Sequence, residues 1–127
     1  MPRLVGSILT EDGAFRTQVA ALLRAGTMPV SLGGDPLDDA SGDIAIVDAR
    51  CDAAAAMTTV ERVRLAAPAV AIFVVADEAP PELILHAMRA GANEFLTWPP
   101  ADTAFSEAVA RAAARRQSSA GSRQARR

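Results

Sequence analysis

Three carboxylates follow predicted buried strands, and they are the residues of this chain best placed to do chemistry. Asp48 closes the apolar run 44–47, and Glu11 and Asp12 follow the apolar run 4–9. Open α/β sheets bind ligands at the carboxyl ends of their strands, which makes Asp48 the first candidate for function. The chain has 13 basic side chains, all arginine, so a reaction at Asp48 that needs an ammonium group has no lysine to supply it.

Several other chemistries are excluded by the residues present. The sequence has no Walker lysine, no Gly-x-Gly-x-x-Gly motif, no Cys/His cluster with metal-ligand spacing and no Ser-His-Asp arrangement. The single cysteine, Cys51, cannot form an internal disulfide, and we expect it to be a small buried apolar residue. His86 is a lone histidine that we place at the surface or its boundary. Nucleotide hydrolysis within these 127 residues is not expected.

Strand-like and helix-like segments alternate along residues 4–116, and they must position the carboxylates. Apolar, β-branched runs predict strands at 4–9, 28–32, 44–47, 70–75 and 94–97. Helical periodicity predicts one helix that follows the first strand and ends before Gly26, and three more over 53–66, 81–89 and 102–116. The connection 33–42 is dense in Gly, Pro and Asp, and it leaves room for only a shortened second helix.

This alternation predicts an α/β protein, a three-layer αβα sandwich around a five-stranded parallel sheet. The flavodoxin-like strand order 2-1-3-4-5 fits five strands, and its crevice lies between the ends of strands one and three. Glu11, Asp12 and Asp48 should converge there. Asp12 is also placed to cap the first helix.

Charge and composition divide the chain into a domain, residues 1–116, and a tail, residues 117–127. Residues 111–127 hold six arginines and no acid, a formal charge of +6 that leaves −8 on residues 1–110 and a net charge of −2. The tail is rich in Ser, Gln, Gly and Ala, so we expect a flexible, solvated basic linker rather than a nucleic-acid site. No run approaches the roughly 20 apolar residues of a membrane span, and no secretory h-region is present. A cytoplasmic protein is expected.

Four segments carry a family resemblance: the acidic loop 8–16, the strand 43–48, the strand end 73–78, and the stretch Ala-Gly-Ala-Asn-Glu-Phe-Leu-Thr-Trp-Pro at 90–99. On these segments the chain resembles the CheY-like receiver domains of bacterial response regulators, over nearly all of residues 3–116. The resemblance implies that Asp48 is the phosphoacceptor and that clustered acids hold Mg²⁺.

Three positions depart from the active receiver pattern. Thr10 replaces the first acid, Ala76 replaces the hydroxyl residue after strand four, and Trp98 replaces the lysine before the proline of strand five. Glu11 and Asp48 remain as metal ligands, so the resemblance implies at most a vestigial Mg²⁺ site and no other cofactor. We favour a degenerate pseudo-receiver whose Asp48 is hydrogen-bonded or solvated. The alternative is a two-component phosphorelay receiver phosphorylated on Asp48.

Trp98 precedes Pro99, and an aromatic residue before proline favours the cis isomer, which receivers also use here. Two positions of its indole remain open. The ring closes over the Asp48 crevice and excludes phosphate, or it lies outward as a contact residue. We favour the first.

Residues 81–97 resemble most closely the atypical receiver of CpaE/TadZ proteins, the ParA/MinD-like ATPases of type IV (Flp/Tad) pilus assembly. There a receiver precedes a Walker-containing ATPase domain, which this chain lacks and into which residues 117–127 would lead.

The resemblance implies a non-enzymatic interaction, dimerisation or localisation module associated with the cell pole. Its partner would be a second copy or a pilus-assembly or polar-localisation protein, with no nucleic acid or membrane insertion. A small flavodoxin-like enzyme or ligand-binding domain is a further alternative. The expected contact face contains Leu85, Arg89, Glu94, Asp102 and Arg111.

Overall fold

Five parallel strands form one sheet in the order β2-β1-β3-β4-β5, which confirms the predicted fold. The computed structural model describes residues 4–26, 28, 30–37, 42–101 and 103–125. The strands are β1 (Leu4–Leu9), β2 (Val30–Leu32), β3 (Ile44–Asp48), β4 (Ala71–Ala76) and β5 (Glu94–Thr97). β1 lies between β2 and β3, so the strand order reverses beside the ends of β1 and β3. This reversal creates the crevice that the sequence predicted.

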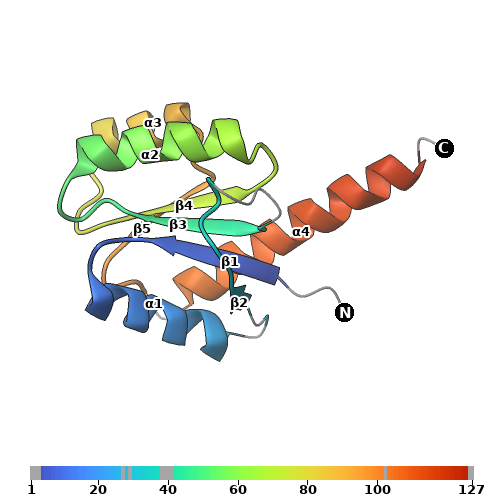
Figure 1. Cartoon of the computed structure of the whole chain (residues 1–127), viewed down its shortest axis with the longest axis horizontal. Coiled ribbons are helices and arrows are strands. Elements are labelled where there is room, and N and C mark those ends of the chain that lie inside the picture. The colour runs from blue at the N-terminus through green and yellow to red at the C-terminus, as the bar shows by residue number, and fades with distance from the viewer. Residues whose placement is uncertain (1–3, 27, 29, 38–41, 102, 126–127) are drawn as a thin grey trace.

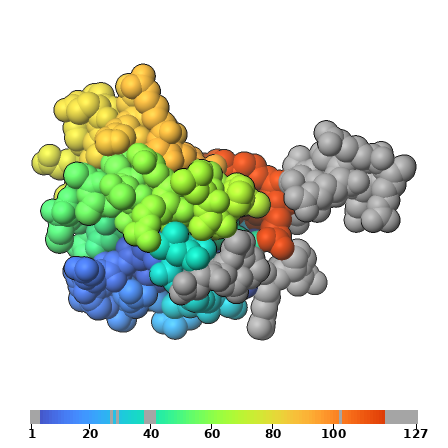
Figure 2. Space-filling model, turned by 45° about the horizontal axis from the view of Figure 1, so that its top comes forward, coloured from blue at the N-terminus to red at the C-terminus, as the bar shows by residue number. Residues whose placement is uncertain are grey.

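Helices cover both faces of the sheet, which gives three layers (Figure 1). α1 (Gly13–Ala25) and α4 (Ala104–Ala125) lie on one face, and α2 (Ala53–Ala66) and α3 (Pro81–Ala90) lie on the other. α2 and α3 lie side by side at the surface of the molecule (Figure 2). No helix in the described part of the chain is long and apolar enough to span a membrane.

β3 and β4 are buried on both faces because their residues are apolar at every position. Ile44 and Ile46 point into the core beneath α1 and α4, while Ala45 and Val47 point into the core beneath α2 and α3. Every residue of β4 is buried. A strand covered by helices on both sides needs this continuous apolar run, and it holds Asp48 at a fixed strand end.

The helix ends follow the predicted signals. The Asp12 carboxylate caps α1 by accepting hydrogen bonds from the backbone N–H groups of Ala14 (2.9 Å) and Phe15 (3.2 Å), as expected. α3 begins at Pro81 and ends at Gly91, whose φ of 125° is a conformation that glycine adopts without a Cβ clash.

The last helix is longer than predicted. α4 runs to Ala125 rather than ending at Arg116, so the backbone of residues 117–125, predicted to be a flexible linker, is helical. A helix already nucleated on the sheet gains a hydrogen bond for each added residue. The helix is about 33 Å long at 1.5 Å per residue, and its last turns extend past the sheet (Figure 1).

One smaller prediction also needs correction: β2 begins at Val30 rather than residue 28. The connection between β2 and β3, where a shortened second helix is predicted, contains a turn at Pro36 and Leu37 and no helix in its described part. Gly33, Gly34 and Pro36 disfavour helix, and the Asp35 carboxylate accepts a hydrogen bond from the backbone N–H of Leu37 at 2.8 Å. Residues 38–41 lie outside the described part.

Candidate functional site

The predicted acidic residues do meet at the carboxyl edge of the sheet. β1 delivers Thr10, Glu11 and Asp12, and β3 delivers Asp48. The amino-terminal ends of α1 and α2 lie at the same edge (Figure 1). This position is the switch point of the strand order, as the fold requires.

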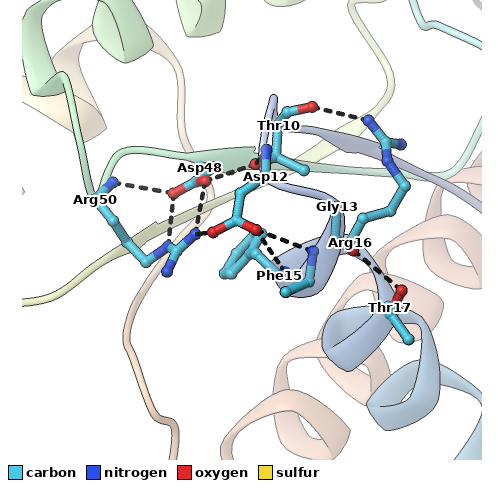
Figure 3. Close-up of polar contacts among 9 residues, drawn as sticks. Thr10, Asp12, Gly13, Phe15, Arg16, Thr17, Asp48 and Arg50 are labelled. Carbon is cyan, nitrogen blue, oxygen red and sulfur yellow. Dashed lines mark hydrogen bonds and ion pairs between the residues drawn. The ribbon is translucent and has the colours of Figure 1, made fainter.

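The Asp48 carboxylate accepts four hydrogen bonds (Figure 3). Its Oδ1 accepts from the backbone N–H of Arg50 at 3.0 Å and from Arg50 Nε at 3.0 Å. Its Oδ2 accepts from Arg50 Nη2 at 3.1 Å and from the Thr10 hydroxyl at 2.6 Å. Only 9% of the Asp48 side chain is exposed. This matches the expected hydrogen-bonded carboxylate, and both oxygens are engaged.

Arg50 belongs to this site although the sequence did not predict it. Its Nη2 also donates to Asp12 Oδ2 at 2.9 Å, so one guanidinium joins two carboxylates. The guanidinium carbon lies 4.1 Å from the centre of the Phe15 ring, which adds a cation–π contact. The only sequence signal was an arginine two residues after a strand-end aspartate, and such a spacing does not define where the side chain points.

The Thr10 hydroxyl completes the local network because it both donates and accepts a hydrogen bond. It donates to Asp48 and accepts a hydrogen bond from the backbone N–H of Asp12 at 3.0 Å. Arg16 fixes the same loop by donating to the carbonyl oxygens of Ile8 (2.9 Å) and Thr10 (2.8 Å). A threonine in place of an acid therefore serves as a bridge between β1, α1 and Asp48.

The electrostatics of the site follow from this arrangement. Burial alone would raise the pKa of Asp48, but hydrogen bonds from Arg50 and Thr10 outweigh it and lower the pKa below the ordinary 3.8. The Arg50 hydrogen bond likewise lowers the pKa of Asp12. The hydrogen bond to Asp48 raises the pKa of Arg50, despite some burial. Both carboxylates are therefore ionised and the guanidinium charged at neutral pH.

The residues present do not fit the magnesium ion that the family resemblance implies. Such an ion needs carboxylate oxygens that are free to bind it. Here Arg50 and Thr10 already occupy both oxygens of Asp48, and Arg50 Nη2 lies between Asp48 Oδ2 and Asp12 Oδ2. Glu11 is exposed, and no hydrogen bond or ion pair described in the structure joins it to Asp48. No group of three or more metal-binding side chains occurs among the described residues.

Trp98 does not line the cavity beside Asp48, although we favoured a position over the crevice. The Trp98–Pro99 bond is cis, as predicted. The indole packs inward, with its ring centre 4.8 Å from that of Phe15 and 6.5 Å from that of Phe105. Arg50, on the Phe15 ring, is the side chain that covers Asp48. Ala76 is buried at the end of β4, where its carbonyl accepts a hydrogen bond from the Trp98 N–H at 2.9 Å.

A cavity of about 820 Å³ opens beside Asp48, between residues 33–37, which follow β2, and helix α2. Gly33, Gly34 and Leu37 line one side, and Ala55 and Thr59 of α2 line the other. Cys51 lies in its wall and is exposed, so the prediction of a buried cysteine was wrong. Cys51 follows the strand in the loop before α2, where no second layer covers it. His86 is exposed on α3, as expected.

Comparison with solved structures gives matches over most of the chain. A pilus assembly-related protein from Burkholderia pseudomallei is 27% identical, with a TM-score of 0.75 over 87% of this chain and 90% of its own. A pilus assembly protein, CpaE, from Burkholderia thailandensis is 26% identical, with a TM-score of 0.75 over 87% of this chain and 98% of its own. A response regulator from Thermotoga maritima is 17% identical, with a TM-score of 0.74 over 87% of this chain and 98% of its own.

The structural neighbours of this chain are CheY-like response regulator receiver domains, including CpaE pilus assembly proteins. No protein-family model and no curated protein sequence matches it. Asp48 ends β3 and Ala76 ends β4. The role of Asp48 as a phosphoacceptor, and of Thr10, Ala76 and Trp98 as degenerate positions, stays a prediction.

The structure also places the predicted contact face of the receiver, formed by α3, β5 and α4. Leu85 and Arg89 are exposed on α3. Arg111 of α4 donates two hydrogen bonds to the Glu94 carboxylate of β5, both of 2.8 Å, so these two residues bind each other. Asp102 lies outside the described residues.

Proposed function

We propose that this receiver domain is a non-catalytic protein-interaction module that does not depend on phosphorylation of Asp48. The observation that supports the proposal is that both oxygens of the Asp48 carboxylate already accept hydrogen bonds within the protein. A carboxylate that accepts a phosphoryl group attacks with one oxygen, while a cation bound to the other neutralises charge. Here Arg50 and Thr10 occupy both oxygens, and the departures at Ala76 and Trp98 remove the hydroxyl and lysine of active receivers.

The proposed contact surface is the groove between α3 and β5. It encloses about 480 Å³ and is lined in part by Ile84, Met88 and Phe95. Met88 is 39% exposed, and Leu85, one turn earlier on α3, is 50% exposed. Arg111 and Glu94 form a charged border next to the groove. An apolar centre with a polar rim is typical of a protein interface, and a second copy of this chain is the partner we propose.

Light scattering of the purified protein tests this surface. We expect the wild type to form a dimer at high micromolar concentration. Met88→Glu, in the groove lining, and Leu85→Glu, one turn away on the exposed face of α3, should be monomeric because each places a charge in the apolar part of the proposed contact surface. Leu65→Glu is the matched control, since Leu65 is an apolar residue that is 84% exposed and belongs to α2 rather than to α3, β5 or α4. A wild type that stays monomeric, or equal effects of all three substitutions, would contradict the proposal.

A role in pilus assembly, at the cell pole, is the biological setting that we propose. The support is the similarity to the two Burkholderia pilus assembly proteins, at 26–27% identity over 87% of this chain. Expression of a fluorescently tagged full-length protein in its own host tests this. Polar foci and loss of pili on deletion are expected, whereas diffuse signal with intact pili would contradict the setting.

Phosphorylation on Asp48 is the second candidate, and the position of Asp48 at the carboxyl end of β3 favours it. Asp48 lies at the strand end with its pKa lowered, so an ionised carboxylate is available if Arg50 moves. Beryllofluoride with Mg²⁺ mimics a bound phosphoryl group. Binding that disappears in Asp48→Asn would support this candidate, and we expect no binding by the wild type.

A further inference from the structure

We infer that the Arg50 guanidinium is a built-in cation that takes the place of a divalent metal ion at Asp48, holding the site in a metal-independent state. The inference concerns the Asp48 site alone and does not depend on the interaction surface proposed above. Its basis is that Arg50 occupies both oxygens of Asp48, the carboxylate that a metal ion would have to bind, and joins Asp48 to the neighbouring Asp12.

The geometry of the contact is that of a strong charge-assisted pair. Arg50 Nε and Nη2 approach Asp48 Oδ1 and Oδ2 at 3.0 and 3.1 Å, a two-pronged fork that matches a carboxylate. Nη2 then reaches Asp12 Oδ2 at 2.9 Å. A lysine could not make both contacts in one plane, which accounts for an arginine at this position.

Arg50 is held in place by an aromatic ring and by its own backbone. The Phe15 ring supports one face of it at 4.1 Å, and Trp98 packs against Phe15 from another direction. The backbone N–H of Arg50 donates to the same carboxylate as its side chain. Only 16% of the Arg50 side chain is exposed. A cation supported by an aromatic ring and two carboxylates is positioned before any ligand arrives.

Competition between Arg50 and a free metal ion favours the tethered group. Arg50 is two residues from Asp48, and a tethered ligand acts at an effective concentration of at least about millimolar. Mg²⁺ would also have to give up tightly bound water to enter. The consequence is that the charge at Asp48 is neutralised at all physiological Mg²⁺ concentrations, so the site does not respond to the ion.

Titration with MnCl₂ tests the inference, using manganese alone as the probe. The single tryptophan, Trp98, contacts Phe15 beneath Arg50, so its fluorescence reports a paramagnetic ion at the site. We expect no saturable quenching of the wild type up to about 10 mM Mn²⁺, and affinity at least roughly tenfold higher in Arg50→Ala. Arg50→Gln, which keeps a hydrogen-bond donor for Asp48, is the second variant in case Arg50→Ala does not fold.

The controls separate site binding from general attraction. Arg62→Ala removes an exposed arginine of α2 and should behave as the wild type. Adding Asp48→Asn to the Arg50 variant should abolish the new binding, and guanidinium ions added at low concentration should compete with Mn²⁺ there. Saturable Mn²⁺ binding by the wild type that Asp48→Asn removes would overturn the inference. So would a folded Arg50 variant that gains no binding, or binding that survives Asp48→Asn. None of these three results would change the oligomeric state. A failure of this inference can therefore be told apart from a failure of the interaction proposal.

Discussion

At the scale of single residues, Asp48 shows how its neighbours determine the chemistry of a carboxylate at a strand end. The strand end keeps the carboxylate that a receiver needs, but Arg50 and Thr10 satisfy it internally. A buried carboxylate without partners would be costly, since an unsatisfied charged group loses its hydration. Arg50 and Thr10 therefore stabilise the ionised Asp48 carboxylate inside the fold.

The lowered pKa of Asp48 predicts how its contribution to stability depends on pH. Because the folded protein binds the Asp48 proton less tightly than the unfolded chain does, the contribution is present above pH 3.8 and lost as pH falls through the lower folded pKa. We expect the wild type to be more stable than Asp48→Asn at pH 7, with the difference shrinking below about pH 4. Urea unfolding at several pH values measures this. Parallel pH profiles for the two proteins would contradict it.

Thr10 should matter for stability through its hydroxyl rather than its size. Thr10→Val keeps the shape of the side chain but removes the donor to Asp48 and the acceptor for the Asp12 N–H. We expect a loss of about 1–3 kcal/mol in the free energy of unfolding. Thr58→Val is the control, because the Thr58 hydroxyl only bonds back to Ala54 on an exposed helix face. Equal effects at both positions would mean that the network at Asp48 adds nothing.

At the scale of elements, Arg64 joins α2 to the two neighbouring segments of chain. Its guanidinium donates to the carbonyl oxygens of Gly91, Pro68 and Val70, and Nη2 reaches Asn93 Oδ1 at 2.7 Å. The same Asn93 oxygen accepts the Ile72 N–H at 2.7 Å. One side chain thus satisfies the carboxyl end of α3 and the loops before β4 and β5.

Removal of Arg64 should destabilise the fold far more than removal of its neighbour Arg62. Arg64→Ala leaves several part-buried carbonyl groups without donors, and we expect a loss of about 2–4 kcal/mol. Arg62→Ala, on the exposed side of the same helix, should change stability by less than about 0.5 kcal/mol. Chemical denaturation of both variants makes the comparison. A small effect of Arg64→Ala would show that water replaces these contacts.

At the scale of the whole molecule, α4 is tied to the far edge of the sheet, opposite the Asp48 site. Its own residues Phe105, Ala108, Val109 and Ala112 are buried in the core between α4 and the sheet. Beyond them, Arg116 forms an ion pair with Asp43, whose buried carboxylate also accepts the Val5 N–H at 2.7 Å. The contact joins α4 with the segment leading into β3 and with β1, so it fixes the direction in which the helix leaves the domain.

A double-mutant cycle on Asp43 and Arg116 should reveal this connection. Asp43→Ala leaves the Val5 N–H and Arg116 without a partner, and we expect a loss of about 2–3 kcal/mol. Arg116→Ala should cost less because its side chain is 56% exposed. The two effects should not add, since both remove the same pair. Strict additivity would show that Arg116 does not stabilise Asp43.

The sequence by itself determined the elements and their order. Continuous apolar runs at β3 and β4, a capping Asp12, a terminal Gly91 and an aromatic residue before Pro99 are local signals, and each was confirmed. Alternation of strands and helices then allows few topologies, because crossovers are right-handed. The meeting of Glu11, Asp12 and Asp48 at one edge followed from that topology alone.

Only the tertiary structure decided what those residues do together. The direction of the Arg50 side chain depends on the Phe15 ring, which comes from another element 35 residues earlier in the chain. The inward packing of Trp98 depends on the space between Phe15 and Phe105. Local patterns encode backbone conformation, whereas the partner of a charged side chain is set by distances between segments far apart in sequence. For that reason the fold could be predicted from the sequence, and the internal cation at Asp48 could not.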